Sequence, residues 1–446
     1  MNKIESALQR TTDTKDLVIG AGVLNQTPAL FTKLFPGKKA VIVADTTTYE
    51  VAGQAVERYL REAGIEVAPS HIFTDPHLYA EWSFVEELEN YLKDVDAIAI
   101  AVGSGVINDL TKLVSAHLGR KYMVVGTAVS MDGYTAFGAS ITFEGNKQTF
   151  SCPAPYGVLL DSEISAAAPK HLAASGYADL IAKIPAGADW MISDVMGSEA
   201  LDAFSFGLVQ DGLRDALSAP AAVFEGDVEM TEKLAEGLIM SGFAMQALQS
   251  SRPASGIEHQ FSHCWDMENL CHNGEHVSHG FKVGIGTLVS TAILEFLLEK
   301  DLENLDVEKC VENWKSLEEI EECAKQTFAG NAGLTARALE ETRNKYVDKE
   351  GLRKQLNAIK ESWPTLKEKI RAQIIPFDEV YANLKAVGAP YEPEMIGVSK
   401  ERFRKTLTYM PYMRSRITAI DVLYRCGMID EVVEHLFGKG GHWEVE

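Results

Sequence analysis

Short β-branched runs alternate with helical stretches through the first third of the sequence, and this alternation restricts the possible folds more than any other feature. Apolar runs end near Asp45, Phe73 and Gly103, and each is followed by a segment whose apolar residues have helical spacing. A fourth run, YMVVGTA, follows the helix predicted to begin near Asn108. Strand-helix alternation produces a parallel sheet with helices on both faces. The first third is therefore predicted to be an α/β domain.

The pattern changes after about Pro169. From there on apolar residues recur at helical spacing with few strand signals, so an all-helical second part is expected. A chain of 446 residues is too long for one ordinary core and suits two domains. We predict an α/β domain over residues 1–168 and an all-α domain over residues 169–446. The final segment, GKGGHWEVE, is expected to form a loose tail.

Acidic residues outnumber basic ones in this chain. Asp and Glu total 64 against 42 Lys and Arg, which gives a formal net charge of -22. Such a surface repels nucleic acid and anionic lipid, so neither is expected as a partner. The first residues lack the pattern of a signal peptide, and no apolar run is expected to reach the length of a membrane helix. Six cysteines without a CxxC pair suit a reducing compartment, and a cytoplasmic protein is predicted.

A glycine-rich turn follows the strand that ends at Gly103. Gly103, Ser104 and Gly105 lead into Asn108 and Asp109, which open the next helix. Small residues let a backbone approach a pyrophosphate, and a helix N-terminus offers unpaired N–H groups and a positive dipole end. The turn is therefore a candidate dinucleotide site, although its spacing differs from GxGxxG. The alternative is a tight strand-helix turn that needs glycine for its own geometry.

Asp45 stands at the carboxyl end of the strand AVIVAD and precedes three threonines. Its carboxylate is placed to accept hydrogen bonds from an adenosine ribose, which would favour NAD because a carboxylate repels the 2'-phosphate of NADP. The other interpretation is an N-cap for the following helix. The sequence does not choose between NAD and NADP.

Five of the eleven histidines are concentrated in one short segment: His259, His263, His272, His276 and His279. His259 and His263 are four residues apart, so on a helix they share one face and can serve one site. An HxxxH pair with a distant carboxylate is a recurring way to hold a divalent metal while positions stay open for substrate. The residues alone do not decide which of His259 and His263 is the ligand.

Asp179 is the candidate for the distant carboxylate. It lies in the segment GYADLIAKIPAGADW, a predicted apolar helix interior, where an unpaired charge is costly and a metal or a cation is the usual partner. Lys183, one helical turn later, offers the alternative of a simple ion pair. The residues favour a metal site over a set of scattered structural histidines.

Several segments together resemble one family. The chain carries, in this order, GSGVINDLTK, TAVSMDGYTAF, GYADLIAK, SRPASGIEHQFSHCWD and SHGFKVGIGTL. This order and the approximate spacing are similar to those of glycerol-1-phosphate dehydrogenases, which belong to the dehydroquinate synthase-like and iron-containing alcohol dehydrogenase superfamily. The likeness covers roughly residues 15 to 300. It implies a Rossmann-like nucleotide-binding domain followed by a helical domain that binds metal and substrate, in the dehydroquinate synthase-like fold.

The resemblance also implies roles for individual residues. It implies that the metal ligands are Asp179, His259 and His279. It places His263 and Asp132 beside the substrate. It implies that the cofactor pyrophosphate lies against Gly103, Ser104, Gly105, Asn108 and Asp109. It implies that the nicotinamide half of the cofactor touches Thr127 and Ser130. These roles come from analogy at each position, and the residues do not establish them independently.

The activity implied by the resemblance is the interconversion of dihydroxyacetone phosphate and sn-glycerol 1-phosphate, a small phosphorylated polyol, by hydride transfer to or from NAD or NADP. One divalent metal would assist, and zinc, nickel and iron all suit imidazole and carboxylate ligands. The alternatives are a glycerol dehydrogenase or related polyol dehydrogenase, and a dehydroquinate synthase-like sugar-phosphate cyclase. The sequence does not determine the oligomeric state, and a homo-oligomer is compatible with it.

Two positions depart from the pattern of many relatives. They carry glutamate where this chain has Phe281, and serine where it has Ala136. The first change removes a possible carboxylate behind the metal ligands, for which Glu275 and His276 are candidate replacements. The second removes a hydroxyl near the cofactor and bears on cofactor preference.

A phosphorylated substrate requires local cations in a chain of net charge -22. The sequence offers four candidates: Arg252, Lys282, Arg414 and Arg416. It does not select among them, and this leaves an unphosphorylated polyol as an alternative substrate.

Overall fold

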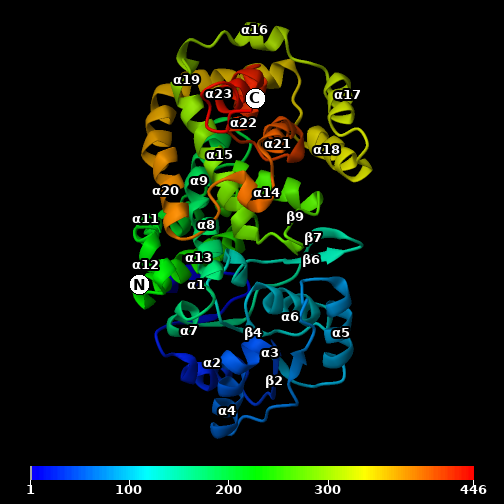
Figure 1. Cartoon of the computed structure of the whole chain (residues 1–446), viewed down its shortest axis with the longest axis vertical. Helices are drawn as coiled ribbons and strands as arrows, with labels where there is room; N and C mark the ends of the chain where they lie inside the picture. The colour runs from blue at the N-terminus through cyan, green and yellow to red at the C-terminus, as the bar shows by residue number, and fades with distance from the viewer. Residues whose placement is uncertain (1–2, 446) are drawn as a thin grey trace. The chain divides into compact units, whose positions relative to one another are not determined.

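The computed structural model describes residues 3–445 (Figure 1). Contacts within the chain divide it into two units. The first unit contains Met1–Leu180, Phe204–Ser251 and Ala386–Ala389. The second unit contains Ile181–Ala203, Arg252–Lys385 and Pro390–Glu446. The chain thus passes between the units several times, and the single domain boundary after residue 168 stays a prediction.

A parallel six-stranded sheet forms the centre of the first unit, with the strand order β1-β8-β5-β4-β2-β3. Its strands are β1 (Asp16–Gly20), β2 (Ala40–Asp45), β3 (His71–Phe73), β4 (Ile98–Gly103), β5 (Met123–Gly126) and β8 (Gly157–Asp161). The apolar runs of the sequence predicted β2 to β5, and the predicted parallel α/β architecture is confirmed. β1 and β8 were not among the predicted strands.

Helices cover both faces of this sheet, as Figure 1 shows for α2, α4, α5 and α6. These are α2 (Thr27–Leu34), α4 (Gln54–Glu62), α5 (Trp82–Leu92) and α6 (Gly105–His117). Phe31 of α2 and Val56 of α4 belong to one apolar cluster with Ile42 and Val102 of the sheet. Both faces of β2 are buried, because every residue from Ala40 to Ala44 is fully enclosed. This explains why the strand reads as a continuous apolar run.

The rest of the first unit is mainly helical. Its other α-helices are α1 (Lys3–Leu8), α3 (Thr46–Thr48), α7 (Ser162–Ala166), α8 (Lys170–Ile181), α10 (Ala203–Gln210), α11 (Leu213–Ala216), α12 (Pro220–Glu225) and α13 (Val228–Leu248). A hairpin of β6 (Ala139–Phe143) and β7 (Asn146–Phe150) follows the loop after β5. α13 packs against η3 (Asp132–Tyr134) in that loop.

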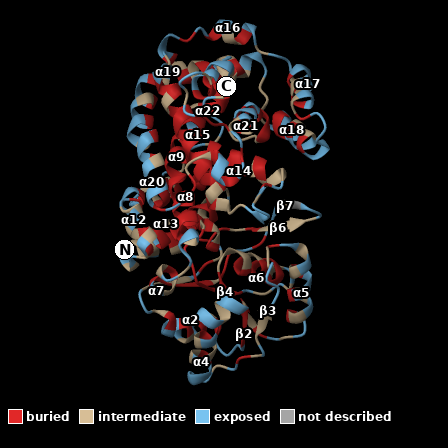
Figure 2. Ribbon diagram, in the orientation of Figure 1, coloured by how far each residue is buried: buried red, intermediate tan, exposed pale blue. Residues whose placement is uncertain are grey.

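The second unit is a bundle of helices around α15, which packs against α14, α22 and α23. Figure 2 shows α9 and α15 as mainly buried. The helices are α9 (Lys183–Val195), α14 (Ile257–Met267), α15 (His279–Glu299), α16 (Val307–Glu312), α17 (Leu317–Thr327), α18 (Ala332–Lys345), α19 (Lys349–Gln373), α20 (Phe377–Ala386), α21 (Lys400–Met413), α22 (Ala419–Arg425) and α23 (Ile429–Phe437).

α15 corrects one expectation, because the sequence does contain a helix of membrane-spanning length. The helix His279–Glu299 has 21 residues and is apolar enough to cross a bilayer by length and composition. Within the chain, 89% of its apolar window is buried by neighbouring helices. A helix that is apolar on every side is what the centre of a bundle requires. Its composition therefore fits the core of the second unit.

Two small features of the second unit also differ from expectation. A two-stranded hairpin, β9 (Cys271–His272) and β10 (Glu275–His276), interrupts the helices. Its turn is the dipeptide Asn273-Gly274, in which both residues have positive φ as a tight hairpin turn requires. The C-terminal segment is not a loose tail, because Trp443 is 2% exposed and packs on the ring of Phe403.

Candidate active site

The carboxyl ends of three neighbouring strands place several predicted cofactor residues along one edge of the sheet. β2 ends at Asp45, β4 ends at Gly103, and Thr127 follows the last residue of β5. The Thr127 N–H donates to the carbonyl of Gly103 at 3.1 Å, so these two segments are directly connected. Open parallel sheets bind ligands at this edge. The position of these residues therefore fits a nucleotide site.

Asp45 is the N-cap of α3, which confirms one of its two interpretations. Its Oδ1 accepts the N–H of Thr48 at 2.8 Å, and the Thr48 hydroxyl accepts the N–H of Asp45 at 3.1 Å. The carboxylate is only partly buried. A capping carboxylate still has further acceptor positions, which a ribose hydroxyl could use. Contact of Asp45 with a ribose therefore stays a prediction.

The turn from β4 into α6 has the features of an anion-binding helix start. Ser104 is the N-cap in extended conformation, and its side chain makes no capping hydrogen bond. The first N–H groups of a helix, starting here at Gly105, have no intrahelical partner and carry the positive end of the helix dipole. Packing by itself is a sufficient reason for glycine at position 103, because a Cβ there would lie 2.7 Å from Ile107. Pyrophosphate binding by this turn stays a prediction.

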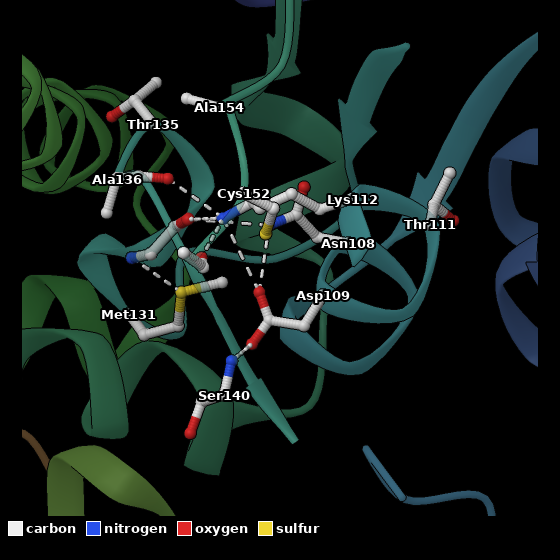
Figure 3. Close-up of polar contacts among 12 residues, drawn as sticks. Asn108, Asp109, Thr111, Lys112, Met131, Thr135, Ala136, Ser140, Cys152 and Ala154 are labelled. Atoms are coloured by element: carbon white, nitrogen blue, oxygen red, sulfur yellow. Dashed lines mark hydrogen bonds and ion pairs between the residues drawn. The ribbon is translucent and has the colours of Figure 1, made fainter. Parts of the chain in front are cut away.

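The side chains of Asn108 and Asp109 point into the interior of the first unit and belong to a polar network around Lys112 (Figure 3). The Asn108 Oδ1 accepts the Tyr122 hydroxyl at 2.9 Å. The Asp109 Oδ2 accepts the N–H of Ser140 at 3.2 Å, and its Oδ1 lies 3.6 Å from Lys112 Nζ. Burial raises the pKa of Asp109, and the charge of Lys112 opposes that rise.

Lys112 holds the loop between β5 and β6. Its ammonium group donates to the carbonyls of Gly133, Ala136 and Gly138 at 2.9 to 3.0 Å, and the residue is 1% exposed. An ammonium group has three donors, so these three bonds use all of them. The backbone of Ala136, one of the two departures from the family pattern, is therefore part of the support of this loop. The sequence analysis did not identify Lys112, although it stands within the GSGVINDLTK segment.

The same loop brings Asp132 to Asp179. The N–H of Asp132 donates to Asp179 Oδ2 at 3.0 Å, and Asp132 Oδ2 accepts the hydroxyl of Ser241 at 2.8 Å. Asp179 is fully buried in α8, as its apolar surroundings in the sequence predicted. Ser130 and Thr127, the predicted nicotinamide contacts, are at most 9% exposed. These four predicted site residues lie on or against one loop that Lys112 supports.

The second unit brings the three predicted histidines together. His259 and His263 lie on one face of α14, as their spacing predicted, with ring centroids 6.3 Å apart. His279 is the first residue of α15, and its ring centroid lies 5.4 Å from that of His259. α14 and α15 can approach this closely because Gly286 has no Cβ. A Cβ at this position would lie 2.4 Å from the carbonyl oxygen of Glu258. The ligand atoms offered by His259 and His279 lie within 4.8 Å of each other.

Glu258 is a functional candidate that the sequence analysis missed. It is fully buried, and its Oε1 lies 2.8 Å from Nδ1 of His259 and accepts the N–H of Gly256 at 2.5 Å. Burial raises the pKa of Glu258 to about 7. In its ionised form the carboxylate only accepts, and it then favours the tautomer in which His259 Nδ1 carries the proton and Nε2 keeps a lone pair for a metal. Glu275 and His276 were considered for this supporting role, and both lie exposed on β10. In the sequence, Glu258 is notable only because it directly precedes His259 in GIEH, and this position alone does not indicate a role.

Replacing Glu258 by alanine is expected to weaken metal binding about 10- to 100-fold, because the orientation and basicity of His259 depend on this hydrogen bond. The measurement is the metal dissociation constant by competition with a coloured chelator. Glu258→Gln retains an acceptor oxygen and is the matched variant, with an expected loss smaller than that of alanine. Equal affinity in Glu258→Ala and the parent protein would contradict the supporting role.

His263 is kept neutral by its surroundings. Burial lowers the pKa of His263 well below its usual range, and the charge of Arg414 lowers it further, while Asp266 acts in the opposite direction. A neutral imidazole has one donor and one acceptor nitrogen. Near neutral pH, His263 therefore offers one donor and one acceptor to a ligand without carrying a charge.

Asp179, His259 and His279 each offer one ligand atom of a type that binds divalent metals. One carboxylate and two imidazoles form a donor set that suits zinc, iron or nickel and leaves coordination positions open. The hydrogen bond between Glu258 and His259 is the kind of support that metal-ligating histidines require. The residues therefore fit a divalent metal, although they do not identify it.

Comparison with known proteins places this chain among dehydrogenases. Residues 18–169 match the family model of iron-containing alcohol dehydrogenases. The glycerol-1-phosphate dehydrogenase [NAD(P)+] of Bacillus licheniformis is 32% identical over 66% of this chain and 74% of its own length. That of Halalkalibacterium halodurans is 33% identical over 60% of this chain and 67% of its own length.

Solved structures with the same fold extend over almost the whole chain. Glycerol dehydrogenase from Schizosaccharomyces pombe has a TM-score of 0.59 and 16% identity, covering 95% of this chain and 91% of its own. Sulfoacetaldehyde reductase from Bifidobacterium kashiwanohense, solved with NAD+, has a TM-score of 0.56 and 14% identity, covering 96% and 98%. Likeness at this level of identity concerns the fold, which includes the part of the chain after residue 300 that the sequence resemblance did not reach.

Proposed function

We infer the reaction of this protein from one premise: the chain belongs to the glycerol-1-phosphate dehydrogenase family. It is an NAD(P)-dependent, metal-dependent alcohol dehydrogenase. The substrate pair that we assign is dihydroxyacetone phosphate and sn-glycerol 1-phosphate, interconverted by hydride transfer. The observation that carries the assignment is the pairing of His259 with His279, with Glu258 behind it, in a chain of this family.

We assign the metal to Asp179, His259 and His279, with one ligand atom from each side chain. A divalent ion held there supplies Lewis acidity to the C2 oxygen of the substrate, and the nicotinamide supplies or accepts the hydride. The backbone N–H of Asp132 donates to Asp179 and restricts the orientation of its carboxylate. This hydrogen bond would hold one of the three proposed ligands ready for the metal.

His263 and Asp132 are assigned to the substrate. His263 lies beside His259 on α14 and is neutral, so it can donate a hydrogen bond to a substrate hydroxyl or take part in proton transfer. Asp132 is held by Ser241 on the loop that Lys112 supports. Its carboxylate is an acceptor for a hydroxyl of the same substrate.

The cofactor is assigned to the carboxyl edge of the sheet. The turn from Gly103 to Asp109 would receive the pyrophosphate, Asp45 the adenosine ribose, and Thr127 with Ser130 the nicotinamide half. A carboxylate at position 45 favours NAD over NADP by repulsion of the 2'-phosphate. The absence of disulfides among the described cysteines and the acidic composition fit a cytoplasmic enzyme.

Metal-reconstituted protein is expected to oxidise NADH or NADPH with dihydroxyacetone phosphate, followed at the absorbance of the reduced nicotinamide. A chelator should abolish this turnover because the metal polarises the ketone. Unphosphorylated dihydroxyacetone, tested under the same conditions, is the matched comparison.

Each result of this assay has a defined meaning. Chelator-sensitive turnover of the phosphate ester supports the assignment. Turnover of dihydroxyacetone alone would favour the second candidate function, that of a glycerol dehydrogenase. A glycerol dehydrogenase is among the solved structures that share this fold. A chelator that leaves full turnover would contradict the metal site.

A further inference from the structure

Three arginines gather in the second unit near the start of α14. Arg252 lies in η4 (Arg252–Ala254), just before this helix, and is 1% exposed. Arg414 and Arg416 lie in the segment between α21 and α22 and are partly exposed. Glu199 Oε2 lies 3.5 Å from Nη1 of Arg252 and 3.6 Å from Nε of Arg416. One carboxylate is therefore shared by two guanidinium groups.

Arg414 and Arg416 converge on one neutral oxygen. The Ser255 hydroxyl accepts Nη1 of Arg414 at 3.2 Å and Nη1 of Arg416 at 3.1 Å, and the Ser255 carbonyl accepts the same Arg416 nitrogen at 3.1 Å. Arg414 makes no ion pair with any side chain in the described part of the chain. A guanidinium group has five N–H donors, so Arg414 retains unused donors beside a second positive charge.

Burial and neighbouring positive charges lower the pKa values of Arg414 and Arg416. Burial lowers the pKa of Arg414 to about 9, with Arg416 as the next cause. Burial likewise lowers the pKa of Arg416 to about 10, and the charge of Arg252 contributes. Like charges held together in a partly buried place repel each other, and an anion between them removes this repulsion. Forked guanidinium donors match the oxygens of a phosphate group.

The four candidate cations differ in burial and in the partners that they already have. Lys282 forms an ion pair with Asp266 and is 2% exposed, so its charge is already compensated. Arg252 is buried and donates to the carbonyl of Asp189 at 2.5 Å. Arg414 and Arg416 remain as the partly exposed pair. The N-terminus of α14 is not available instead, because Asp189 Oδ2 already accepts the N–H of Ile257 at 2.9 Å.

The position of the pair connects it to the reaction. Ser255 precedes α14, the helix that carries His259 and His263, by two residues. The charge of Arg414 acts on His263, the residue assigned to the substrate. An anion bound by Arg414 and Arg416 would therefore lie beside Ser255, at the start of the helix that carries His259 and His263.

We propose that Arg414 and Arg416, aligned by Ser255, bind the phosphate group of a small phosphorylated polyol. The proposal rests on the proposed function and adds to it the group that distinguishes a phosphate ester from a free polyol. Both residues lie about a hundred positions beyond the region of sequence resemblance. Phosphate is also part of the nicotinamide cofactor, so the experiment must separate these two sources.

The first arm uses inorganic phosphate as the probe and metal-reconstituted protein, and it requires no turnover. Isothermal titration at constant ionic strength should show phosphate binding to the parent protein. Arg414→Gln should weaken it about 10- to 100-fold, because a hydrogen-bonded charged group is lost. Arg404→Gln is the matched control, since Arg404 is exposed on α21 and carries the same charge.

The second arm compares kinetic constants. In Arg414→Gln, KM for dihydroxyacetone phosphate should rise about 10- to 100-fold. KM for the nicotinamide cofactor should stay at the parent level. Arg414→Lys keeps the charge but loses the fork, and it should recover part of the affinity. This variant also answers the objection that glutamine impairs folding.

The outcomes separate the site from the reaction. Phosphate binding that depends on Arg414, in a protein without turnover of dihydroxyacetone phosphate, would support the anion site and refute the proposed reaction. Unchanged phosphate affinity in both Arg414 variants would overturn the site. A rise in cofactor KM without a change for the substrate would also overturn it, because the arginines would then bind a cofactor phosphate.

Discussion

His259→Ala is expected to remove the bound metal and to lower kcat/KM by about a thousandfold or more, since the metal stabilises developing charge by several kcal/mol. Asp179→Asn should have the same effect, because an amide is a poorer ligand than a carboxylate of the same shape. Both variants should keep the helical circular dichroism of the parent. Metal content by atomic emission and turnover of dihydroxyacetone phosphate are the measurements.

The matched variant for this experiment is His263→Ala on the same helix. His263 is assigned to the substrate, so its loss should leave the metal in place and reduce the rate by about a hundredfold. Equal loss of metal from His263→Ala and His259→Ala would make His263 a ligand. Full activity in metal-free His259→Ala protein would refute the site as a whole.

Lys112→Met is expected to lower the free energy of unfolding by about 3 to 5 kcal/mol, because three buried carbonyls and the buried carboxylate of Asp109 lose their partner. Methionine has a similar length and fills most of the space, so a cavity contributes little. Turnover should fall as well, since Lys112 supports the loop that carries Asp132. Urea denaturation followed by circular dichroism measures the stability.

Lys38→Met provides the control for this substitution. Lys38 is exposed in the same unit, and the exchange removes the same charge from water. It should change the free energy of unfolding by about 0.5 kcal/mol or less, as most surface substitutions do. A Lys112→Met protein as stable as Lys38→Met would show that the loop does not depend on the ammonium group.

The interpretation of the fold from sequence succeeded where the signal was local. β2, β4 and β5 are short apolar runs bounded by turn or loop residues. α14 places His259 and His263 on one face because residues four apart lie on the same face of any helix. The strand order was not accessible in this way. β1 pairs with β8, and Asp16 lies opposite Gly157, so this pairing depends on contacts far apart in the chain.

The interpretation failed where a local pattern was outweighed by packing. The tail GKGGHWEVE has the composition of a loose end, yet Trp443 is enclosed by Phe403 and Phe437. α15 has the composition of a membrane helix, yet its neighbours in the second unit bury it. In both cases the apolar side chains found partners that composition does not specify.

For the candidate site, the sequence by itself determined which chemical groups are present: the histidines of α14 and α15, the buried Asp179 and the glycine turn before α6. Periodicity and residue type are sufficient for this because they act over a few residues. Only the tertiary structure decided which groups support them. The carboxylate behind His259 is Glu258, the cation under the loop is Lys112, and the arginines beside Ser255 come from 159 and 161 residues later in the chain. Burial and hydrogen bonding between remote segments select these partners, and no local pattern contains that information.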